Sequence, residues 1–133
     1  DHMEKEYKYG KGSKESKAYD MDKTGFDLPL HPIGIEMCVA NQHTVNDIEW
    51  KIVYVSPMQR TLQTTIHMFK NHPNKDNIKF VILPIVREVL KKINDIAMDP
   101  KTLIKMFAPG QEICEGIKFD FSNPFVYGIP ELW

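Results

Sequence analysis

A strand, a helix and a second strand follow one another along the middle of the chain, and this order limits the fold more than any other feature. Residues 52–55 are β-branched or aromatic, and residues 78–83 form a second apolar run bounded by polar and proline residues. Between the two runs, apolar residues recur at the spacing of one helical face: Met58, Leu62, Ile66 and Phe69. Strands joined by a helix pair in parallel, and helices cover parallel sheets on both faces. The sequence therefore predicts an α/β fold of three layers, with a mostly parallel sheet and helices on both faces.

Further helices are expected on either side of this unit. Pro32 suits the first turn of a helix over residues 32–43, whose apolar face would hold Ile35, Cys38 and Val39. The pair Asp99-Pro100 is a second helix start, for residues 100–107, because an aspartate caps free backbone amides and a proline fits the first turn. Residues 110–133 show no clear period and are expected to be irregular.

Length and composition indicate a single folded unit. With 133 residues, 42% of them hydrophobic, the chain is long enough for one core and too short for two. Residues 1–26 are polar and lack a period of either kind, so we expect an arm or an insertion there, followed by one domain over residues 27–133.

Charge and cysteine content exclude several function classes. A net charge of −1 does not favour a nucleic-acid partner, and no apolar run of about eighteen residues predicts a membrane span. Cys38 and Cys114 lack the spacing of a zinc site and are too few for a disulfide framework, so neither is predicted and a reducing intracellular compartment is favoured. No other metal site and no cofactor is expected. The five histidines show no convincing ligand spacing, and we expect them at the surface.

Arginine is rare in this chain, and its positions suggest a site. Of the seventeen basic residues only Arg60 and Arg87 are arginines, and each follows one of the two predicted strands by a few residues. Ligands of parallel α/β sheets bind beyond the carboxyl ends of the strands, where helices begin. A guanidinium there can hold an anion with paired hydrogen bonds, together with the amides of the helix. Glu88, after the second strand, would place a carboxyl group at the same edge. If partly buried, it would have a raised pKa and could donate a proton.

These residues also have a simpler interpretation. An arginine in the first turn of a helix is commonly a solvated or ion-paired surface group, and carboxylates in the loops after strands are common. The spacing alone leaves both interpretations open.

Three segments resemble the histidine phosphatase superfamily, whose fold is called phosphoglycerate mutase-like. Its second conserved motif is similar to residues 55–64, which read Val55-Ser56-Pro57-x-x-Arg60-x-x-Gln63-Thr64. A helix start that precedes it is similar to residues 28–36, with His31 in place of the usual capping threonine. A segment after the next strand is similar to Leu83-Pro84-x-x-Arg87-Glu88. The three segments follow the family's order and together cover residues 27–90.

The resemblance implies a role for two of these residues and a reaction class. Arg60 would bind the phosphate, and Glu88 would be the general acid that protonates the leaving oxygen. In this family a histidine attacks the phosphoryl group of a phosphomonoester and forms a phosphohistidine. The Arg-His-Gly motif that carries this histidine, and the later His-Gly pair, do not occur in residues 1–133. The resemblance therefore implies a partial domain, expected to be a segment of a longer protein.

Two functions follow from this pattern. The first is phosphoryl transfer on a phosphorylated small molecule or a phosphoprotein, with the given segment inactive by itself. The alternative is a non-catalytic, phosphatase-like subunit with a structural or interaction role, whose partner would be a larger protein assembly. An Arg-His-Gly sequence shortly upstream of residue 1 would favour the enzyme.

Overall fold

A parallel sheet lies at the centre of the part that the computed structural model describes, residues 27–86 and 97–124. Its strands are β1 (Ile52–Val55), β2 (Lys79–Ile82) and β3 (Phe119–Asp120), in the spatial order β1-β2-β3. β1 and β2 pair in parallel, with Val53 opposite Phe80 and Val55 opposite Ile82. The predicted α/β class and the parallel pairing of these two strands are confirmed.

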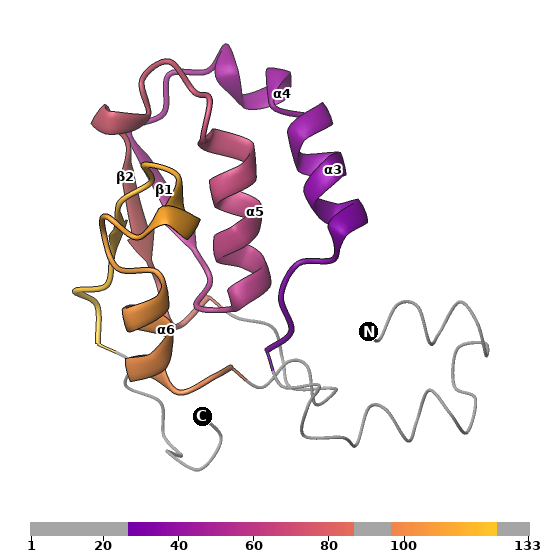
Figure 1. Ribbon diagram of the computed structural model, residues 1–133. Coiled ribbons are helices and arrows are strands. Elements are labelled where there is room, and N and C mark those ends of the chain that lie inside the picture. The colour runs from indigo at the N-terminus through magenta and orange to yellow at the C-terminus, as the bar shows by residue number, and fades with distance from the viewer. Residues whose placement is uncertain (1–26, 87–96, 125–133) are drawn as a thin grey trace, which may run out of the picture.

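Helices occur at the three places that the sequence predicts, but the first is shorter than expected and a separate short helix follows it. They are α3 (Pro32–Ala40), α4 (His43–Asn46), α5 (Gln59–Phe69) and α6 (Pro100–Met106), with 3-10 turns η2 (Lys75–Asn77) and η4 (Glu112–Cys114). The helix expected over residues 32–43 is divided, because α3 ends at Ala40 and the short α4 follows after Asn41 and Gln42. α3 packs against α5 and lies on the side of α5 away from the strands (Figure 1).

The apolar face predicted for α5 is confirmed. All four residues of this face are buried, and Leu62 has no exposed surface. They are Met58, Leu62, Ile66 and Phe69. Phe69 meets the ring of Phe80 edge to face at 5.3 Å and the ring of Trp50 at 5.8 Å. These contacts lock α5 to β2 and to the segment that leads into β1.

Only one face of this sheet is covered by the described helices. The chain passes from β1 through α5 to β2 and from β2 through α6 to β3, always toward the same edge of the sheet. Right-handed crossovers that advance in one direction place both connecting helices on the same face. On that face Phe80 and Ile82 are buried, whereas Tyr54 on the opposite face is 60% exposed and Asp120 is also exposed. The helices expected on the second face do not lie among residues 27–86 and 97–124.

The third strand corrects the expectation of irregular structure after residue 110. Phe119 and Asp120 pair in parallel with Phe80 and Val81. Phe119 is buried, with its ring 6.3 Å from the rings of both Phe80 and Phe107. A strand of two residues is too short to show a period of two, so packing rather than pattern defines it.

Leu62→Ala is expected to lower the free energy of unfolding by about 2–5 kcal/mol, because it leaves a cavity between α5 and the sheet. Met37→Ala is the control, since Met37 is 61% exposed on α3 and its truncation leaves no cavity. Urea unfolding of both variants measures the difference, and equal losses would show that the face of α5 is wrongly assigned.

Candidate functional site

Arg60 lies at the edge of the sheet where the strands end. β1 ends at Val55, the turn of residues 56–58 follows, and Arg60 is the second residue of α5. Its side chain is half-buried. The first amides of α5 point away from the helix at this end, where the helix dipole is positive. The position predicted for Arg60 at the carboxyl edge of a parallel sheet is therefore confirmed, and its role in binding phosphate stays a prediction.

The turn before Arg60 is held by Thr61. Met58 is extended (φ −111°, ψ 142°), which makes it the residue that precedes the first turn of α5. The hydroxyl oxygen of Thr61 accepts a hydrogen bond from the amide of Met58 at 3.3 Å. That oxygen also lies 2.5 Å from the carbonyl of Ser56 and 2.7 Å from that of Met58, and its single proton goes to one of them. The short connection from strand to helix is thus fixed from within α5.

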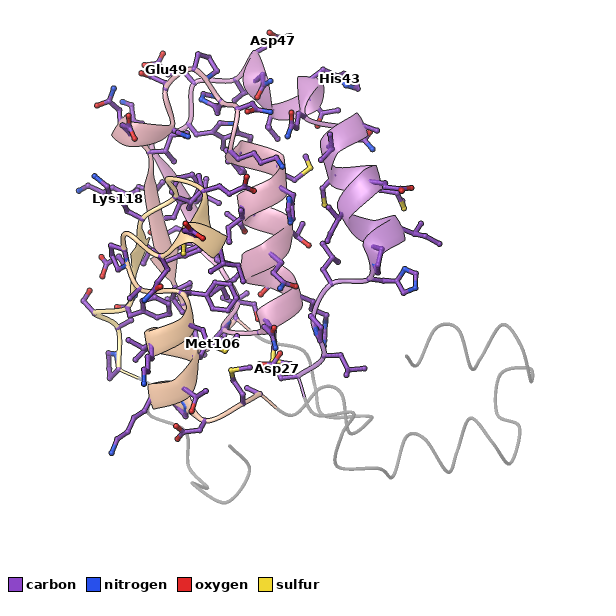
Figure 2. The ribbon with its side chains drawn as sticks, viewed as in Figure 1. Asp27, His43, Asp47, Glu49, Met106 and Lys118 are labelled. Carbon is purple, nitrogen blue, oxygen red and sulfur yellow. The ribbon has the colours of Figure 1, made fainter. Side chains whose placement is uncertain are left out.

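A buried carboxylate, which the sequence did not reveal as part of the site, also lies at this end of α5. Asp27 is 1% exposed, and Figure 2 shows it at the amino end of the helix. One of its carboxylate oxygens accepts a hydrogen bond from the amide of Gln59 at 2.7 Å, and the other accepts one from the amide of Met98 at 3.1 Å. The side chain of Gln59 returns a bond to the carbonyl of Asp27 at 3.0 Å.

Burial raises the pKa of Asp27 above its ordinary value. The amides of Met98 and Gln59 and the nearby Arg60 guanidinium favour the charged form, but they do not outweigh the loss of solvent. The ionised form of Asp27 therefore lowers the stability of the folded protein.

This shift predicts how the stability depends on pH. The free energy of unfolding of the wild type, relative to that of Asp27→Asn, is expected to rise as the pH falls from about 7 to about 3. The carboxylate of Asp27 binds a proton more readily in the folded protein than in the unfolded chain, where its pKa is near 3.8. The stability that protonation of Asp27 contributes is fully present below the pKa of the unfolded chain. It is lost as the pH rises through the pKa of Asp27 in the folded protein. Urea unfolding at a series of pH values measures it.

Asp120→Asn is a control of opposite sign. Hydrogen bonds from Ser122 lower the pKa of the Asp120 carboxyl, so the stability that Asp120 contributes is present above its ordinary pKa and is lost on acidification. The same direction of change for Asp27→Asn and Asp120→Asn would contradict the assignment.

The second strand ends at the same edge as the first. The carbonyl of Val55 accepts a hydrogen bond from the amide of Leu83 at 2.9 Å, and that of Ile82 accepts one from the side chain of Asn123 at 3.1 Å. The chain is described as far as Val86, and Arg87 and Glu88 lie outside the described residues. The approach of Glu88 to Arg60 therefore stays a prediction, as does the polar arm of residues 1–26.

One histidine and both cysteines of the described segments are buried. His72 is buried, contrary to expectation, and both ring nitrogens have backbone partners. One accepts a hydrogen bond from the amide of Asn74 at 3.0 Å, and the other lies 3.0 Å from the carbonyl of Ile48. Burial raises the pKa of both thiols, Cys38 and Cys114, which disfavours the reactive thiolate. Among residues 27–86 and 97–124, no three histidine, cysteine or acidic side chains are grouped as metal ligands would be.

The fold and the position of Arg60 define an α/β domain with its candidate site at the carboxyl edge of a parallel sheet. The family model described as histidine phosphatase superfamily (branch 1) matches residues 14–90, which is more than half of the chain. The chain belongs to this superfamily. No curated protein and no solved structure matches the chain significantly. The helices described here include none with the length and apolar character needed to cross a membrane.

Proposed function

We propose that this chain forms part of a phosphoryl-transfer domain in which Arg60 binds the phosphate and Glu88 is the general acid. The observation that carries the proposal is the position of Arg60. It stands at the amino end of α5, at the carboxyl edge of a parallel sheet, in a chain of the histidine phosphatase superfamily. The substrate class is a phosphomonoester, either a phosphorylated small molecule or a phosphoprotein.

The chemistry of this end of α5 suits an anion. A guanidinium donates paired hydrogen bonds to phosphate oxygens, and the adjoining helix adds the positive end of its dipole. The hydroxyl of Ser56, half-buried directly after β1, is a further donor at this edge. Phosphoryl transfer depends mainly on holding the group in position and on neutralising the charge of its oxygens. Glu88 would supply the proton for the leaving oxygen.

Titration with inorganic phosphate, followed by amide NMR spectra, tests the binding site. The expected result is a saturable shift of the amides of Ser56 and of residues 58–60, with the amides of η2 at the opposite end of α5 as the internal control. Shifts confined to other surfaces, or no saturation, would overturn the assignment of Arg60 to phosphate.

A second function, that of a non-catalytic subunit, is favoured by one observation. Residues 1–133 contain neither Arg-His-Gly nor a His-Gly pair, so they do not include the nucleophile of the family.

We expect residues 1–133 to hydrolyse an aryl phosphate no faster than background. A longer chain carrying an upstream Arg-His-Gly sequence is expected to gain turnover, and changing that histidine to alanine to abolish it. Phosphate binding without turnover in the longer chain would favour the non-catalytic subunit.

A further inference from the structure

Asp27 joins three segments that are far apart in the sequence. It directly precedes the stretch that leads into α3, and its two carboxylate oxygens accept hydrogen bonds from residues 32 and 71 positions away. One of these residues, Gln59, is the first residue of α5, and the other, Met98, comes shortly before α6. A single carboxylate therefore links the amino end of α5 to the segment that enters α6.

The hydrogen bond from the amide of Gln59 to Asp27 supplies a capping acceptor, which α5 lacks in its own neighbouring residues. Helices usually begin with a serine, threonine, asparagine or aspartate, whose oxygen accepts from a free amide. The residue at this position of α5 is Met58, which has no such oxygen. Asp27 provides the acceptor from a distant part of the chain, and it does so one residue before Arg60.

A cap needed only for stability would not require a buried charge. Asp99, which caps α6, shows the ordinary solution, because it is exposed and accepts from the amide of Thr102 at 3.1 Å. Asp27 instead is fully enclosed next to Arg60, at a cost that its raised pKa reflects. A fixed carboxylate with two amide partners holds the backbone of Gln59, the residue before Arg60, in one place.

We infer that Asp27 is a positioning residue for Arg60: it anchors the first residue of α5 and thereby sets where the guanidinium meets a phosphate. This inference rests on the proposed function for its effect on binding. Its structural part, the dependence of the Arg60 side chain on Asp27, stands by itself and can be measured without a ligand.

Asp27→Glu separates position from charge. It keeps the negative charge but moves both oxygens by one methylene in an enclosed site. It is expected to weaken the binding of inorganic phosphate about tenfold, the effect of one lost hydrogen bond to a charged group. Asp99→Glu, the matched change at the exposed cap of α6, is expected to stay within about twofold, as surface substitutions generally do. Isothermal titration calorimetry of both variants and the wild type provides the affinities.

Asp27→Asn serves if Asp27→Glu does not fold. Asparagine retains one acceptor but turns its NH2 group toward one of the two amides, so one bond is broken while the size is unchanged. The expected result is a shift of the Arg60 Nε resonance and faster amide exchange at Gln59 or Met98. In the Arg60→Ala background the effect of Asp27→Asn on phosphate affinity should disappear, because coupled residues are not additive.

Three results decide the inference. An unchanged Arg60 Nε resonance in folded Asp27→Asn, or equal phosphate affinity in Asp27→Glu and Asp99→Glu, would overturn it. Tighter phosphate binding by Asp27→Asn with the Arg60 resonance unmoved would show a role in charge alone and would also overturn it. If the wild type binds no phosphate, the proposed function fails, and the Arg60 resonance alone then confirms or overturns the positioning role.

Discussion

Replacing Phe80 with alanine is expected to lower the free energy of unfolding by about 3–5 kcal/mol, the range for a buried aromatic side chain. Phe80 is 1% exposed in the middle strand and touches the rings of Phe69 and Phe119 at centroid distances of 5.3 and 6.3 Å. Its removal opens a cavity at the point where α5, β2 and β3 meet, and these rings lose their edge-to-face partner. Urea unfolding followed by circular dichroism gives the measurement.

Tyr54→Ala is the matched control for this prediction. Tyr54 is also an aromatic residue of the sheet, but it is 60% exposed on the face opposite to α5 and α6. We expect a loss clearly smaller than that of Phe80→Ala, because little apolar surface returns to water. A loss at Tyr54 as large as that at Phe80 would mean that the second face of the sheet is covered in solution and would contradict the one-sided core described here.

Arg60→Ala is expected to weaken the binding of inorganic phosphate about 10- to 100-fold, the effect of removing one or two hydrogen bonds to a charged group. The variant keeps the positive end of the α5 dipole, so weak binding should persist. Arg60→Lys is expected to fall between the wild type and Arg60→Ala, because lysine keeps the charge and loses the paired donors. Calorimetric titration with phosphate measures all three affinities.

Lys79→Ala controls for the loss of positive charge as such. Lys79 is exposed at the start of β2, at the edge of the sheet opposite to Arg60. Its removal is expected to change the phosphate affinity only slightly, through a long-range effect that salt screens. Equal losses in Arg60→Ala and Lys79→Ala, or full affinity in Arg60→Ala, would show that phosphate does not bind at the amino end of α5.

The helices α5 and α3 show when a periodic pattern of apolar residues identifies the buried side of a helix. In α5 polar residues separate the apolar ones, so the pattern identified the buried side. In α3 apolar residues occur all round the helix, and Val39, expected on the buried face, is 44% exposed while Cys38 is buried. Where a helix has no polar side, only its packing against α5 decides which residues are covered.

The sequence by itself determined the βαβ unit and the place of Arg60. Both depend on neighbours in the chain: a short apolar strand, a turn and the start of a helix lie within residues 52–60. Only the tertiary structure decided the role of Asp27, the burial of His72 and the addition of β3. Asp27 contacts residues 32 and 71 positions away, His72 bonds to Ile48, and β3 is defined by pairing with β2. Hydrogen bonds and ring contacts between distant segments leave no period in the sequence, because they form only when packing brings those segments together.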